Sequence, residues 1–147
     1  MLATCPNVHF FLAPTVSILN VWHLPDFHQE WFDLGLIGPN EWTTNILNYP
    51  THLNIQALPS WYKQGVTTKY KQYLDIWTAQ NHKFERTANA FGSIIKYMWE
   101  DNLIDEFPKF IEYMKTLDEI REENMEEVFP ELKILVRPQP EPEELFI

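Results

Sequence analysis

The side chains best placed to hold a ligand follow the first apolar run of the chain. Residues 8–12 are apolar apart from His9, a pattern typical of a strand buried on both faces of a parallel sheet. Thr15, Ser17 and Asn20 come at or beyond the carboxyl end of that predicted strand. Ligands collect at this end of the strands in α/β sheets. These side chains either bind a ligand or satisfy the backbone of the following turn and helix, and the sequence leaves both interpretations open.

Other chemistry-bearing residues fit structural roles better. His23 and His28 are five positions apart, so they do not share a helical face as a metal-binding i, i+4 pair would. A Ser–His–Asp set made of Ser17, His23 and Asp26 lacks a nucleophile-elbow pattern around the serine. Cys5 is the only cysteine, so the chain cannot form an internal disulfide or hold an iron–sulfur cluster with its own thiolates.

Charge and composition argue against several classes of protein. The chain carries 21 acidic and 11 basic residues, a formal net charge of −10, and this field disfavours binding to nucleic-acid phosphates. No glycine-rich dinucleotide or P-loop motif occurs. The apolar run over residues 8–21 is interrupted by polar residues and is too short to span a bilayer. Since no secretory leader pattern is visible either, we expect a cytoplasmic protein without a membrane partner.

The first 58 residues predict an α/β unit of strands and one helix. Pro25 suits the first turn of a helix and Gly35 its C-cap, and apolar residues recur at helical spacing over 24–34. Residues 42–47 predict the next strand, and residues 53–58 a short strand or an extended connector. This order of strand, helix and strands predicts a parallel sheet.

The remainder of the chain predicts helices. Over residues 59–137, apolar side chains recur at spacings of three and four residues, which indicates about three helices. The first of these helices is expected to start at Pro59 or Ser60. Residues 80–82 interrupt the pattern once, and it breaks again near Asn102. We expect the third helix to reach about residue 128, before Pro130. Residues 138–147 are an acidic, proline-rich tail that need not fold.

A series of short segments carries a family resemblance in its order and spacing. The segments are Cys5–Phe10, Pro14–Asn20, His23–His28, Leu34–Ile37, Asn45–Leu47, Pro50, Leu58–Pro59, Lys69–Tyr70, Ile120–Asn124 and Val128–Leu132. Together they resemble the carboxyl-terminal part of twitch-domain radical SAM proteins, which are common among phage and marine bacterial sequences. The resemblance runs from about Cys5 to Leu132, and no single short motif carries it.

The resemblance implies a fold, a cofactor and candidate site residues. Proteins of this family form a partial (β/α) barrel in which three closely spaced cysteines hold a [4Fe–4S] cluster that binds S-adenosylmethionine. By position, residues 10–20 resemble a late barrel strand that lines the adenosine side of the site. The resemblance therefore implies that Ser17, Leu19 and Asn20 lie on the cofactor side, and no catalytic residue carries over.

The chain departs from the family where the cluster should be bound. It has one cysteine rather than three and no Gly-Gly-Glu-Pro segment for the amino group of the cofactor. We therefore expect an N-terminal radical SAM half, from the same gene or a split gene, as its partner. On this interpretation the chain alone binds neither S-adenosylmethionine nor the [4Fe–4S] cluster and is inactive. An exposed strand edge around residues 8–12 is also expected.

A second function from a different class stays open at this point. The aromatic helices and the expected strand edge also suit a non-enzymatic protein-interaction module of phage origin. A small metal-dependent hydrolase built on the histidines is a third and weaker interpretation.

Overall fold

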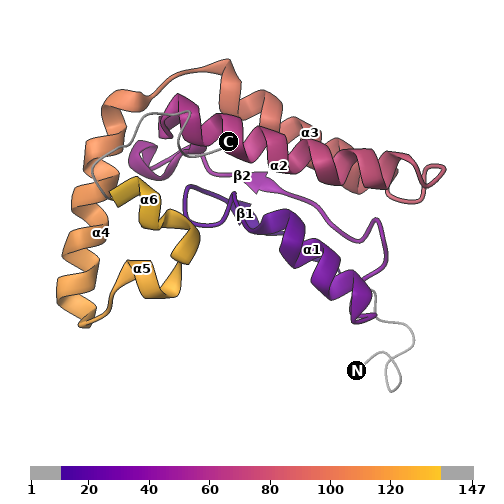
Figure 1. The fold of residues 1–147 in the computed structure, drawn as a ribbon, viewed down its shortest axis with the longest axis horizontal. Helices are drawn as coiled ribbons and strands as arrows, with labels where there is room; N and C mark the ends of the chain where they lie inside the picture. Colours follow the sequence, from indigo (N-terminus) through magenta and orange to yellow (C-terminus); the bar gives the residue numbers. More distant parts are fainter. Residues whose placement is uncertain (1–10, 137–147) are drawn as a thin grey trace.

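The computed structural model describes residues 11–136 of the chain, which begin with two short parallel strands joined by a helix (Figure 1). Strand β1 (Thr15–Val16) precedes helix α1 (Leu24–Asp33), and strand β2 (Asn45–Ile46) follows it. Thr15 lies opposite Asn45 and Val16 opposite Ile46, and a bridge between Leu12 and Trp42 extends the pairing. The predicted strand–helix–strand order and its parallel sheet are therefore confirmed. Most of the strand expected over residues 8–12 lies outside the described residues.

The helix between the strands has the boundaries that its sequence predicts. Pro25 lies in the first turn of α1, where the missing N–H removes no helical hydrogen bond. Gly35 follows the last turn with a φ of +74°, a left-handed conformation that glycine adopts without steric cost. These two residues explain why the helix begins and ends where it does.

One face of the small sheet is covered and the other is open. Trp42 is fully buried against Phe91, with ring centroids 5.5 Å apart, and against His28 at 5.1 Å. Val16 is also fully buried. The alternate positions on the opposite face are exposed: Ala13, Thr15, Thr43 and Asn45. Side chains alternate across a strand, so the buried and the exposed residues lie on opposite faces of the sheet. Within residues 11–136, helices therefore cover one of these faces.

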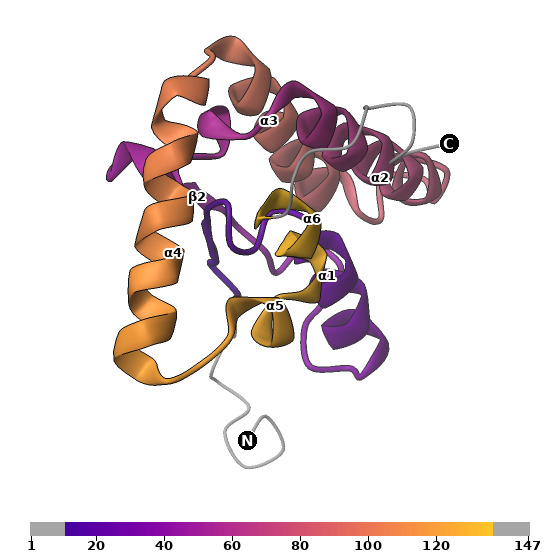
Figure 2. The ribbon, with the colours of Figure 1, turned by 60° about the vertical axis from the view of Figure 1, so that its left-hand side comes forward.

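Two long helices form a hairpin that covers this sheet face. Helix α2 (Ser60–Thr78) and helix α3 (Glu85–Glu100) run side by side, as Figures 1 and 2 show. Asn81 and His82 both have positive φ in the connection, which confirms the predicted break at residues 80–82. The largest fully buried side chains are Trp42, Trp77, Tyr62, Tyr70, Phe84, Phe91 and Phe110. The core is thus aromatic and unites the strands with the helices.

The segment before this hairpin differs from the strand alternative. Residues 53–58 fall in two 3-10 turns, η1 (Thr51–Leu53) and η2 (Ile55–Ala57). The Asn54 side chain accepts a hydrogen bond from the Gln56 N–H and so favours a turn over an extended chain. The strand alternative for this segment is therefore wrong, and the connector is a pair of turns.

The carboxyl-terminal helices are shorter than expected. After η3 (Ile104–Glu106), helix α4 (Phe107–Arg121) ends because Glu122 turns left-handed, with a φ of 54°. The predicted extension of this helix to residue 128 is therefore wrong. A new helix, α5 (Met125–Val128), starts at the Asn124 side-chain cap, and η4 (Pro130–Leu132) and α6 (Lys133–Val136) follow.

This last segment folds back beside the turn that follows β1. Figures 1 and 2 show α5 and α6 between α4 and α1. Leu132 and Leu135 are buried there. The Tyr62 hydroxyl of α2 donates a hydrogen bond to the Glu131 carbonyl at 3.4 Å. Within residues 11–136, no helix combines the length and apolar character that crossing a bilayer demands.

Candidate functional site

The turn after β1 holds Ser17, Leu19 and Asn20, which the family resemblance implies to be cofactor-side residues. The Asn20 amide oxygen accepts a hydrogen bond from the Ser17 N–H at 2.9 Å, and its nitrogen donates to the Thr15 carbonyl at 2.8 Å. The Ser17 hydroxyl accepts a hydrogen bond from the Leu19 N–H at 3.2 Å. Ser17 and Asn20 therefore satisfy the backbone of the turn, as one of the two open interpretations predicts. Contact of these residues with a cofactor stays a prediction.

A pocket of about 290 Å³ adjoins this turn. Leu19, Asn20 and His23 line one side of it, and residues 128–131 line the other. The fold thus brings two of the three predicted residues together at one pocket, whereas Ser17 is not part of its lining. The contribution of residues 128–131 could not be foreseen, because it depends on how the carboxyl-terminal segment folds back.

The open face of the sheet adds candidate residues to Thr15, which the sequence already indicates as a ligand-side residue. Thr15 and Asn45 lie opposite each other in the parallel register, and both side chains are exposed. Ala13 and Thr43 extend the same face and are exposed as well. Thr43 and Asn45 are not among the residues predicted from the sequence, because the register between the two strands decides which side chains share this face.

A polar network lies just beyond the carboxyl end of β2. The buried Asn54 side chain donates hydrogen bonds to the Tyr97 hydroxyl at 2.8 Å and to the Asn48 carbonyl at 3.3 Å. The Tyr97 hydroxyl donates in turn to the Asn48 amide oxygen at 2.7 Å, and the Gln56 amide donates to the Tyr97 carbonyl at 2.8 Å. Amide side chains therefore follow both strands, which gives the carboxyl edge of the sheet a polar character.

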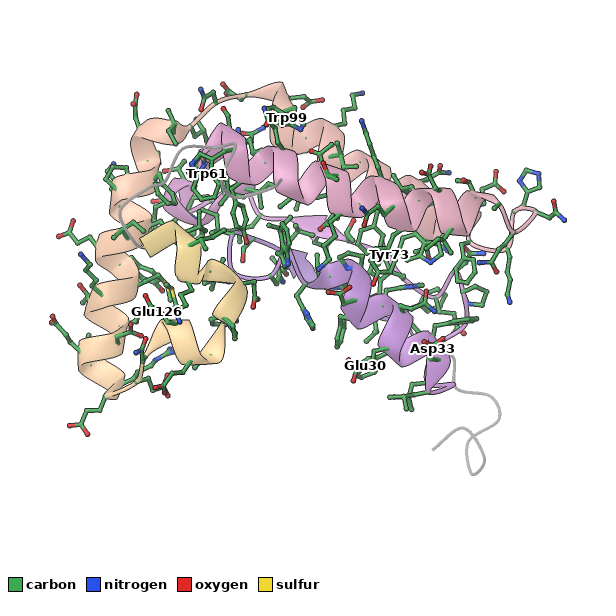
Figure 3. The ribbon with its side chains drawn as sticks, viewed as in Figure 1. Glu30, Asp33, Trp61, Tyr73, Trp99 and Glu126 are labelled. Carbon is green, nitrogen blue, oxygen red and sulfur yellow. The ribbon has the colours of Figure 1, made fainter. Side chains whose placement is uncertain are left out.

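The carboxylate of Asp26 joins α1 to α2. Lys69 Nζ lies 2.5 Å from Asp26 Oδ2 and also donates to the Trp22 carbonyl at 2.7 Å. Tyr73, which Figure 3 shows pointing from α2 toward α1, donates to Asp26 Oδ1 at 2.5 Å. Burial favours a raised pKa for Asp26, but the hydrogen bonds from Lys69 and Tyr73 outweigh burial and lower the pKa. Burial, together with the bond to Asp26, raises the pKa of Tyr73 to about 12.

These contacts do not assemble the Ser–His–Asp set considered from the sequence. Asp26 is held by Lys69 and Tyr73, and His23 Nδ1 lies 3.9 Å from Asp26 Oδ2. The Ser17 hydroxyl is bonded to the Leu19 backbone instead. A nucleophile needs a hydrogen-bonded base, and the described contacts of Ser17 provide none.

His28 is a core residue. Its ring is fully buried and meets the rings of Trp42 and Trp77 edge-on, at centroid distances of 5.1 and 5.2 Å. Burial lowers the pKa of His28 to about 4, although the nearby Pro39 carbonyl acts in the opposite direction. The imidazole is therefore neutral at pH 7. Among residues 11–136, no group of three or more His, Cys, Asp or Glu side chains is arranged to hold a metal ion.

The chain has no match among family models, curated proteins or solved structures.

Proposed function

We propose that this chain is the carboxyl-terminal part of a radical SAM enzyme, in which β1 and β2 belong to a partial (β/α) barrel. The remaining strands and the [4Fe–4S] cluster come from an N-terminal half with the three-cysteine loop. The open, polar face of a parallel sheet is the single observation that carries the proposal. The family resemblance of the sequence supports it independently.

The composition of that face supports a position inside a barrel. Parallel sheets are normally covered on both faces, whereas within residues 11–136 helices cover one face of this sheet. In a (β/α) barrel the helices lie outside and the opposite face of each strand points to the interior. Here that face holds Ala13, Thr15, Thr43 and Asn45, which are exposed. Small side chains with hydroxyl and amide groups leave room for a polar ligand and can hydrogen-bond to it.

The backbone edges of the sheet support the addition of further strands. Within the described residues, the N–H and C=O groups of Thr44 and Ile46 on the outer edge of β2 have no hydrogen-bond partner. The same holds for both groups of Ala13 on the outer edge of β1. An unpaired edge is a template for another strand. The edges of this sheet can therefore take strands from a second polypeptide segment.

The iron–sulfur cluster does not fit the residues of this chain. Cysteine thiolates hold such clusters, and the single Cys5 lies outside the described residues. We therefore assign cluster binding to the N-terminal half alone. The open face and the pocket beside Leu19 and Asn20 are the surfaces that this chain offers to S-adenosylmethionine.

Co-purification with the expected partner tests the proposal. The reading frame immediately upstream in the genome is expected to encode a Cys-x-x-x-Cys-x-x-Cys loop. Its product, purified anaerobically with this chain, should form a stable complex that holds the cluster and binds S-adenosylmethionine. Thr15→Val should weaken that binding by about tenfold through loss of one hydrogen bond from the open face. The matched control, Ser93→Ala on the exposed side of α3, should leave it unchanged. A genome without such a frame, or halves that do not associate, would contradict the proposal.

The second candidate is a non-enzymatic interaction module of phage origin. Leu34 and Leu36, which are 65% and 48% exposed on either side of Gly35, favour this alternative. Neighbouring exposed apolar side chains mark a contact with another protein where they form a contiguous patch. A complex that depends on these two leucines and contains no iron would support the module and contradict the enzyme.

A further inference from the structure

Asn20 makes an unusual pair of hydrogen bonds at the edge of β1. The carbonyls of Pro14 and Val16 face β2, where they accept hydrogen bonds from the Asn45 and Leu47 N–H groups, each at 3.0 Å. Because successive residues of a strand point in opposite directions, the Thr15 carbonyl faces the outer edge instead. Asn20 reaches that edge with its side-chain amide.

The two bonds of Asn20 reproduce those of a neighbouring parallel strand. In a parallel ladder, a residue that lies opposite position i donates its N–H to the carbonyl of residue i−1 and accepts a hydrogen bond from the N–H of residue i+1. Around Val16, the Asn20 amide donates to the Thr15 carbonyl at 2.8 Å and accepts from the Ser17 N–H at 2.9 Å. A joining strand cannot bond to these groups unless it displaces Asn20.

The groups nearer the start of β1 are free for a partner. Within the described part of the chain, the N–H and C=O of Ala13 and the N–H of Thr15 have no hydrogen-bond partner. The unpaired stretch of this edge therefore ends at the Thr15 N–H. A partner strand that continues the sheet can pair up to this point and must then diverge from β1.

We propose that Asn20 is a positioning residue that stops the neighbouring strand at Thr15 and thereby holds open a ligand cleft at the carboxyl end of the sheet. This inference rests on the proposed function, since the strand belongs to the N-terminal radical SAM half. Ligands bind where neighbouring strands separate at their carboxyl ends. Leu19 and Asn20, in the turn that follows β1, line the pocket of about 290 Å³. Asn20 therefore acts on the sheet edge, in addition to any contact with a ligand.

Amide hydrogen exchange of the full chain, measured by NMR, tests the role of Asn20 directly. The Ser17 N–H should exchange more slowly than the N–H groups of Ala13 and Thr15. Asn20→Ala should speed exchange at Ser17 by about tenfold, the worth of one hydrogen bond. Asn89→Ala, at an exposed position of α3, is the matched control and should leave exchange at Ser17 unchanged. Equal exchange at Ser17 in wild type and Asn20→Ala would overturn the inference.

The complex with the N-terminal half provides the second readout. Binding of the half should protect the Ala13 and Thr15 amides in wild type and in Asn20→Ala. In Asn20→Ala, binding of the N-terminal half should also protect the Ser17 amide, because the added strand can now continue past Thr15. The affinity of the pair for S-adenosylmethionine should fall about tenfold. The two halves should associate as tightly as they do in wild type. Halves that associate with no renewed protection at Ser17 in the variant would overturn the role of Asn20 alone. Halves that do not associate would contradict the proposed function.

Discussion

Lowering the pH should destabilise this protein through His28. The imidazole is fully buried, with the rings of Trp42, Trp77, Phe84 and Phe91 all within 6.3 Å between centroids. A charged imidazole in this environment loses its hydration without gaining an acidic partner. The folded state therefore binds a proton at His28 only at a much lower pH than the unfolded chain does.

The size of the effect follows from the difference between the two pKa values. The pKa of His28 falls from the ordinary 6.5 to about 4 in the folded protein. Between these values the unfolded state holds more protons, so the free energy of unfolding decreases as the pH is lowered. One pKa unit corresponds to about 1.4 kcal/mol, which gives a loss of about 3 kcal/mol between pH 7 and pH 4. Domains of this size are stable by about 5–15 kcal/mol, so the loss is a substantial share.

Urea denaturation followed by circular dichroism, at intervals from pH 7 to pH 4, measures this slope. His28→Phe should remove most of it, because the aromatic cluster then holds no titrating group. His82→Gln is the matched control, since the His82 side chain is 83% exposed, and should keep the slope. A His28→Phe protein with the wild-type slope would refute the reasoning. NMR titration of the His28 ring in wild type gives an independent check, and an apparent pKa near 6.5 would contradict the assignment.

Three further changes should have defined effects on stability, each measured by urea denaturation. Asp26→Asn should lower the free energy of unfolding by about 1–3 kcal/mol, because it weakens the charged hydrogen bonds from Lys69 and Tyr73. The pKa of Asp26 is lowered in the folded state, so the wild type should keep this stabilisation above pH 3.8 and lose it as the pH falls below that value. Trp42→Ala should cost about 3–5 kcal/mol by leaving a cavity against Phe91, and a loss under 1 kcal/mol would contradict its place in the core. Gly35→Ala should cost about 1 kcal/mol through its positive φ alone, since no atom lies within 4 Å of the added methyl, and an unchanged stability would argue against the left-handed C-cap.

The strand–helix–strand unit could be predicted because its signals are local. Pro25 and Gly35 act on the backbone of their own turn, and the apolar spacing over residues 24–34 repeats with the helical period. The break at residues 80–82 was readable for the same reason. Each of these features depends on neighbours in the sequence and not on the rest of the fold.

The features that the sequence reasoning missed depend on single side chains or on distant contacts. Glu122 ends α4 in a left-handed conformation, although glutamate gives no helix-stop signal. The period-two pattern of residues 53–58 resembles a strand, but the Asn54 side chain bonds to the Gln56 N–H and fixes a turn. Local side-chain bonds of this kind compete with regular structure and are not visible in a hydrophobic pattern.

The place of Ser17, Leu19 and Asn20 in the fold could be predicted, whereas their contacts could not. Ser17, Leu19 and Asn20 do lie at the carboxyl end of β1, as the parallel sheet requires. Their bonds to the backbone of the turn, and the closure of the pocket by residues 128–131, follow from tertiary packing. Thr43 and Asn45 could not be predicted as candidates, because only the pairing of the two strands shows that they share an open face with Thr15.

Formation of 5′-deoxyadenosine from S-adenosylmethionine, under anaerobic reduction, decides whether this chain belongs to a radical SAM enzyme. The assay compares the chain alone, the N-terminal half alone and the reconstituted pair at equal concentrations. We expect the pair to produce 5′-deoxyadenosine and the chain alone to produce none. Robust cleavage by the chain alone, or a stable pair with a complete cluster and no cleavage, would contradict the proposed function.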